Sequence, residues 1–306
     1  RLYVLSYVCV CFQFRALCFN VRKLCSFCFR STIMDTKMIS TSTTKSSDHM
    51  TVTQASSRKE IISPATVVEV KDISNSVKML SLRIENEDFS FKAGQWVDTF
   101  IPGLDTVGGF SMCSSPGLLQ TQRILKLAIK FAKHPPAFWV HTKCKSGDTL
   151  LLRAGGDFYL DPQPGEENPS DVLLIAGGVG INPLYSMIQH LADLNQSPDG
   201  PYRANVLMLY SARTYPELIF KDHLEQLGDS HANITTQFYV SRETSIHGAV
   251  KVGRISHADV EKAVRVLRSQ RLKVYLCGPS PMVHDMEDYC LNCGVSKNQI
   301  FYERWW

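Results

Sequence analysis

The chain has 306 residues, of which 44% are hydrophobic and 20% are charged, and its formal net charge is +4. This length accommodates two domains that each bury a core, and the composition is that of a globular protein. The charge is too small to argue for a nucleic-acid partner, and the sequence contains no arginine–aromatic RNA-binding motif, so no nucleic-acid partner is expected.

The first segment, residues 1–34, contains no Asp or Glu and places basic side chains such as Arg15 among apolar residues. Such a leader is typical of a mitochondrial transit peptide. Two other interpretations remain open: residues 2–14 form the apolar part of a secretory signal, or the protein starts at Met34 and is cytoplasmic. The apolar run is too short to cross a membrane and is interrupted by Arg15, so no integral span is expected.

The ten cysteines are concentrated in the leader and scattered elsewhere, which is typical of a reducing compartment rather than a disulfide scaffold. The pairs Cys25/Cys28 and Cys290/Cys293 would have to meet from opposite ends of the chain to form a zinc site. We interpret both spacings as chance and predict no metal site.

A stretch rich in Ser and Thr predicts a disordered linker over residues 35–60. Short β-rich runs separated by turns follow it, and they predict a small antiparallel barrel over residues 61–165. The expected strands are Ala65–Val70, Val77–Ile84, Gln95–Ile101, Ile124–Phe131 and Thr149–Arg153.

From residue 170 to residue 306, apolar strands alternate with helices, which predicts an α/β domain with a doubly wound parallel sheet. The expected strands are Val172–Ala176, Ala204–Tyr210, Ile234–Val240 and Lys273–Cys277. The expected helices are Leu184–Leu194, Pro216–Leu227, His257–Arg268 and Pro281–Cys293, the first with its apolar face formed by Leu184, Met187, Ile188 and Leu191.

A glycine-rich loop joins the first of these strands to its helix. Glycines let a backbone approach an anion closely, and the following helix presents unpaired N–H groups and the positive end of its dipole. We therefore expect this loop to hold the pyrophosphate of a nucleotide through backbone N–H groups; its residues are Gly177, Gly178, Val179, Gly180, Ile181 and Asn182. The turn at Cys277, Gly278 and Pro279 ends another parallel strand and should lie at the same edge of the sheet.

The loop departs from the usual dinucleotide fingerprint in two ways. Pro183 replaces the third glycine, and no acidic residue ends the second strand, where Ser211 and Arg213 follow Tyr210 instead.

Taken together, these motifs resemble the ferredoxin–NADP reductase superfamily over about residues 60–306. The resemblance implies a flavin-binding barrel of the ferredoxin-reductase type followed by an NAD-binding domain. Segment 111–116 is similar to the end of the family's flavin motif, and segment 277–282 is similar to its nicotinamide-side turn. A narrower likeness to one vertebrate member rests on Gly94–Asp98, Val107–Ser111, His134–Ala137 and the terminal Trp-Trp.

The same resemblance implies roles for individual residues. Ser111 would lie near the reactive nitrogen of the flavin, Cys277 would face the nicotinamide C4, and Glu303 would be the family's C-terminal acid. Trp305 and Trp306 would cover the flavin ring. Each also has a purely structural interpretation: a turn serine, a small buried thiol, an exposed acid and aromatic packing on the barrel.

Three residues depart from the family's flavin site. Gly108 stands where the family has its phosphate-binding Arg, Phe110 replaces a Tyr, and Ala137 falls where a Ser or Thr holds the phosphate. Glycine cannot supply the planar fork of donors with which Arg pairs a phosphate. Either FAD or FMN binds through other groups, or a smaller flavin binds, or none does.

The sequence therefore predicts an NAD(P)H-dependent oxidoreductase that passes hydride from nicotinamide to a flavin and on to an unknown acceptor, such as an electron-acceptor protein. NAD is the expected cofactor, and NADP stays open because Ser241 and Arg242 end the third strand of the second domain. The alternative is a non-catalytic NAD(H)-binding sensor or scaffold with a degenerate flavin site. The sequence shows no plant-type iron–sulfur cysteine pattern.

Overall fold

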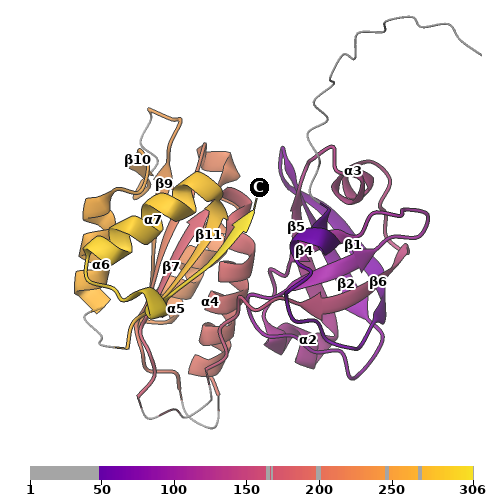
Figure 1. Cartoon of the computed structure of the whole chain (residues 1–306), viewed down its shortest axis with the longest axis horizontal. Helices are drawn as coiled ribbons and strands as arrows, with labels where there is room; N and C mark the ends of the chain where they lie inside the picture. Colours follow the sequence, from indigo (N-terminus) through magenta and orange to yellow (C-terminus); the bar gives the residue numbers. More distant parts are fainter. Residues whose placement is uncertain are drawn as a thin grey trace, which may run out of the picture. The chain divides into compact units, whose positions relative to one another are not determined.

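The computed structural model describes residues 48–162, 166, 168–197, 201–244, 248–267 and 271–305 (Figure 1). The leader at 1–34, the start of the expected linker and Trp306 lie outside the described residues. Within the part of the chain that is described, no helix is long and apolar enough to cross a membrane.

The first sheet, coloured indigo to magenta in Figure 1, contains only antiparallel pairs, in the order β4-β3-β6-β1-β2-β5. A bridge between Met112 and Leu127 brings the end of β4 back to β5, so the sheet curls into a barrel around side chains such as Leu82 and Leu152. The strands are β1 Ser63–Ser74, β2 Val77–Ile84, β3 Trp96–Phe100, β4 Gly108–Ser111, β5 Ile124–Lys130 and β6 Thr149–Gly155.

Two short helices accompany the barrel and were not expected from the sequence: α2 Pro116–Gln122 and α3 Pro135–Thr142. Each has proline at its start, where a missing N–H leaves no helical hydrogen bond unmade. Ser115 caps α2 by accepting a hydrogen bond from the backbone N–H of Leu118.

The second sheet is entirely parallel, in the order β10-β9-β8-β7-β11-β12. Leu174 packs in one core cluster with residues of α4, while Leu173 and Ile175 pack in another with residues of α6 and α7, so helices cover both faces. The strands are β7 Val172–Gly177, β8 Val206–Ala212, β9 Ile234–Val240, β10 Lys251–Val252, β11 Lys273–Pro279 and β12 Ile300–Trp305. The helices are α4 Ile181–Asn195, α5 Lys221–Ser230, α6 His257–Leu267 and α7 Ser280–Asn292.

The strand order confirms the predicted barrel followed by a doubly wound domain. β7 pairs with β8 on one side and β11 on the other, so the chain reverses its direction of winding between β7 and β11. Ligands of such sheets bind beyond the carboxyl ends of the strands at this switch point. The predicted apolar face of α4 is also confirmed, since Leu184, Met187, Ile188 and Leu191 are all fully buried.

The predicted disorder of residues 35–60 is wrong for residues 48–60. Residues 48–58, called here the N-terminal strap, contain helix α1 His49–Val52 and pack on the barrel. Arg58 forms a β-bridge with Gly155, and the N–H of Lys59 donates to the carbonyl of Ala154. The sequence pattern missed these contacts because they are made by a few polar side chains and backbone groups rather than by an apolar run.

Asp98 on β3 binds the strap to the barrel through its carboxylate. This fully buried carboxylate accepts hydrogen bonds from Arg58 at 2.9 Å and Arg153 at 2.7 Å and lies 2.9 Å from Nε2 of His49. Burial would raise the pKa of Asp98, but these hydrogen bonds outweigh burial and lower that pKa to about 2.

We expect Asp98→Asn to lower the free energy of unfolding by about 3–5 kcal/mol, because the partly buried guanidinium groups of Arg58 and Arg153 lose their buried counter-charge. Since the pKa is depressed in the folded state, the carboxylate stabilises the fold above about pH 4, and this stabilisation is lost as the pH falls toward 2. Urea denaturation over a pH series measures both effects. Asp72→Asn is the control, since the exposed Asp72 lies 3.8 Å from Lys78 and its pair should contribute less than about 1 kcal/mol. Equal losses in the two variants would contradict the prediction.

Candidate functional site

The glycine loop lies at the carboxyl end of β7. A single 3₁₀ turn, Gly178–Gly180, leads into α4, whose first residue is Ile181. Gly178 has φ +56°, and no heavy atom lies within 4 Å of the position that a Cβ would take. The loop therefore combines a left-handed glycine, open space above it and the positive end of a long helix, which is the construction of an anion-binding site.

The turn at the end of β11 packs directly against this loop. A Cβ on Gly180 would lie 2.5 Å from the carbonyl oxygen of Cys277, and one on Gly278 would lie 3.1 Å from Cα of Gly177. The two turns thus meet backbone to backbone at the switch point, at the common edge that the sequence predicted. Pro279 follows as the last residue of β11 and is exposed.

The side chains of three predicted loop residues pack inside the protein rather than at the open side of the loop. Ile181 is fully buried, and Val179 packs partly buried against the core around α4. The side-chain amide of Asn182 is buried and donates to the carbonyl of Ala128 on β5 at 2.7 Å. The backbone N–H of Ile181 donates within the turn to the carbonyls of Gly178 and Val179, and the Asn182 side chain links α4 to the barrel.

Two further α4 residues make the same kind of contact, and the sequence reasoning missed them. Ser186 donates to the carbonyl of Ser114 at 2.7 Å, and Gln189 donates to that of Cys113 at 2.7 Å. Together with Asn182 they recur three and four residues apart on a helix that is otherwise apolar on this face. This row of polar side chains on an apolar helix face could have predicted, from the sequence alone, that the helix packs against backbone carbonyl groups.

The structure brings Ser111 and Glu303 together from positions 192 residues apart. The Ser111 hydroxyl donates to Oε2 of Glu303 at 3.4 Å. Glu303 lies on β12, which the sequence did not predict as a strand, and pairs in register with Cys277 on β11. Cys277 itself is fully buried, so its thiol lies beneath the surface at this edge rather than on it.

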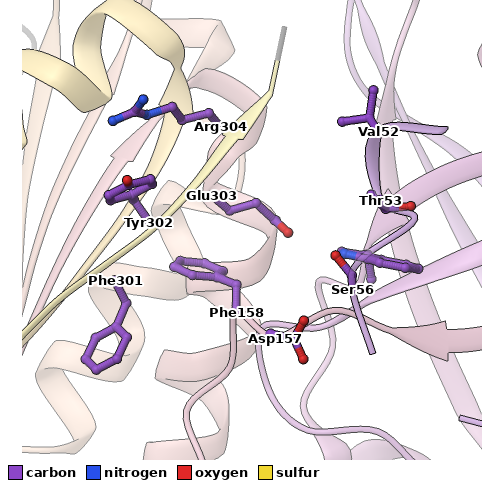
Figure 2. A pocket seen from close by; sticks show the side chains of 10 residues that line it. Val52, Thr53, Ser56, Asp157, Phe158, Phe301, Tyr302, Glu303 and Arg304 are labelled. Carbon is purple, nitrogen blue, oxygen red and sulfur yellow. The ribbon is translucent and has the colours of Figure 1, made fainter. Parts of the chain in front are cut away.

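A cavity of about 380 Å³ adjoins this contact (Figure 2). Its walls come from the strap at Thr53 and Ser56, from Trp96 and Phe158, and from β12 at Glu303. Figure 2 shows the Glu303 carboxylate extending from β12 toward the strap residues, while Arg304 points the other way. A volume near the lower end of the range for ligand pockets suits a single ring system. Trp306 lies outside the described residues, so its expected role stays a prediction.

Residues 174–288 match the family model of the oxidoreductase NAD-binding domain. The chain is 42% identical over 275 residues to oxidoreductase NAD-binding domain-containing protein 1 of Xenopus laevis, covering 87% of this chain and 86% of that protein. The chain belongs to the oxidoreductase NAD-binding domain-containing protein 1 family. This assignment confirms the narrower likeness found in the sequence.

Solved structures share the fold of this family member. Amycolatopsis cytochrome P450 reductase GcoB matches with a TM-score of 0.65 at 23% identity, over 80% of this chain and 69% of that one. The cytochrome b5 reductase domain of Ulva prolifera nitrate reductase matches with a TM-score of 0.65 at 20% identity, over 81% and 97%. These structures share the fold expected from the resemblance to the ferredoxin–NADP reductase superfamily, and the family model identifies residues 174–288 as an oxidoreductase NAD-binding domain.

The residues present fit a nicotinamide dinucleotide and do not fit the phosphate end of a flavin nucleotide. The open cradle at Gly178 suits a pyrophosphate. A Cβ on Gly108, by contrast, would lie 2.7 Å from the ring of Phe110 and 2.9 Å from Cβ of Pro136, so this backbone has no room for an arginine side chain. Ala137 is buried with the barrel core and carries no hydroxyl. The Ser111–Glu303 contact supplies polar groups suited to a flavin ring.

We expect Gly178→Val to abolish detectable NADH binding, because a branched side chain would fill the cradle and resist positive φ. Titration calorimetry with the purified chain measures the affinity. Gly294→Val is the matched control, because Gly294 also has positive φ (+85°) and open space around its Cβ position, but it follows α7. The control should lose similar stability and keep its NADH affinity. Unchanged affinity in Gly178→Val would show that the loop does not hold the nucleotide.

Proposed function

We propose that this protein is an NAD(P)H-dependent oxidoreductase that passes hydride from nicotinamide to a flavin ring, which then reduces an acceptor still to be identified. The observation that carries the proposal is the contact between Ser111 and Glu303 beside the paired turns of β7 and β11. This contact joins a hydroxyl and a carboxylate from two domains, and Glu303 lies in register with Cys277, whose turn packs against the glycine loop. NADH is the expected donor, with NADPH as the alternative.

The chain contributes orientation and electrostatics, while the cofactors supply the redox chemistry. The backbone N–H groups of Gly178–Gly180 and the start of α4 would hold the pyrophosphate. Ser111 donates to Glu303 and can redirect its hydroxyl proton toward a ring nitrogen. The small, fully buried Cys277 would form the floor beneath the nicotinamide, where a larger side chain would displace the ring.

The comparisons support a reductase in general terms. Both solved structures described above are named reductases, although their identity to this chain is low enough that they share only its fold. The proposal therefore rests on this chain's own site.

The alternative function is a non-catalytic NAD(H)-binding protein. The absence of arginine at Gly108 and of a hydroxyl at Ala137 favours it. Steady-state oxidation of NADH with riboflavin, FMN or FAD added separates the two functions. A chain that binds NADH and oxidises it with none of these flavins is a binding protein and not a flavin-linked oxidoreductase.

We expect Ser111→Ala to lower kcat for NADH oxidation about a hundredfold, because it removes the hydrogen-bond donor beside the ring, and to leave the KM for NADH unchanged. Glu303→Gln should lower kcat in the same direction. Glu261→Gln is the control, since Glu261 lies on the exposed side of α6, where it pairs with Arg265 one helical turn away, and this variant should keep wild-type kinetics. If Ser111→Ala kept the wild-type kcat, Ser111 would have no role in the reaction.

A further inference from the structure

The N-terminal strap lies against the strand that carries the flavin motif. A Cβ on Gly109 of β4 would collide with the imidazole of His49, which is almost fully buried. The same imidazole packs edge-on against Trp96 with ring centres 4.8 Å apart, and its Nε2 lies 2.9 Å from Asp98. The strap therefore covers β4 beside Gly108, through contacts to fully buried groups.

The helix that follows β5 is unsuited to a phosphate. Its first two residues, Pro135 and Pro136, carry no backbone N–H, so the start of α3 lacks donors that a helix N-terminus normally offers to an anion. Asp48 lies close enough to His134, the residue before α3, to act on it electrostatically. Burial lowers the pKa of His134, and the Asp48 carboxylate opposes that shift. The Asp48 carboxylate therefore adds negative charge near the start of α3.

The cavity beside Ser111 and Glu303 combines aromatic walls with acidic groups. Phe158, Phe301 and Tyr302 line it with aromatic rings, and Asp157 and Glu303 supply carboxylates. The guanidinium of Arg304 is directed to Glu287 at 3.0 Å. Carboxylates repel phosphate and accept hydrogen bonds from N–H and O–H groups. The occupant that suits this cavity is an uncharged aromatic ring system that carries hydrogen-bond donors.

We propose that the flavin of this protein is a phosphate-free, dissociable substrate of the riboflavin type, and that the strap and the two prolines of α3 exclude the phosphate end of FMN and FAD. The inference rests on the proposed function and names the class of flavin that receives the hydride. NADH delivers a hydride from C4 to the flavin ring, solvent supplies one proton, and NAD⁺ and dihydroriboflavin leave. The reduced flavin then carries both electrons away from the protein.

The first test uses the full chain with NADH and each of three flavins. We expect the protein to purify without visible flavin absorbance and to oxidise NADH with a KM for riboflavin at least about tenfold below those for FMN and FAD. Co-purifying FAD, or a lowest KM for FAD or FMN, overturns the inference and leaves the proposed function standing. Failure to oxidise NADH with any flavin overturns both.

The second test reverses the charge of the strap. Asp48 makes no side-chain capping hydrogen bond, so Asp48→Lys should fold normally. We expect this variant to lower the KM for FMN severalfold and to leave the KM for riboflavin unchanged. Asp222→Lys is the matched control, because Asp222 is an exposed acid on α5. Equal FMN kinetics in wild type and both variants would show that the strap does not select against phosphate.

Discussion

The backbone contact between the β7 turn and the β11 turn is the constraint on which the rest of the site depends. Gly180 can lie against the carbonyl of Cys277, and Gly278 against Gly177, only because none of these glycines carries a Cβ. This contact fixes where α4 begins and therefore where its dipole points. It also fixes the end of β11, and through the register of β11 with β12 it fixes Glu303.

Helix α4 extends the same constraint to the barrel. Its apolar face packs on the parallel sheet, and its stripe of Asn182, Ser186 and Gln189 donates to barrel carbonyls. A buried amide or hydroxyl that lost such a partner would be left unsatisfied at a cost of about 1–3 kcal/mol, so these bonds align the Ser111 segment with the nucleotide cradle. One helix thereby begins at the glycine loop and contacts the segment after Ser111 with its side.

The two halves of the site differ in how many of the family's ligand-binding features they keep. The nucleotide half has its glycines, its helix and its switch point. In the barrel half, Phe110 and Pro136 occupy the space that an arginine side chain at position 108 would need. The imidazole of His49 covers the neighbouring Gly109. The buried Asp98 cluster makes this cover a stable part of the fold. The strap therefore covers the same part of the barrel in which Gly108 and Ala137 depart from the family's flavin motif.

The sequence by itself determined the order of the two domains, most strands, the apolar face of α4 and the glycine loop between β7 and α4, because these depend on local periodicity and on glycine conformation. It missed the strap, helices α2 and α3, and strands β4, β10 and β12. These segments are short, and partners distant in the chain stabilise several of them: β12 lies at the edge of its sheet, beside β11. Only the tertiary structure decided that Ser111 meets Glu303 and that His49 covers Gly109, because such contacts join residues with no periodic relation in the chain.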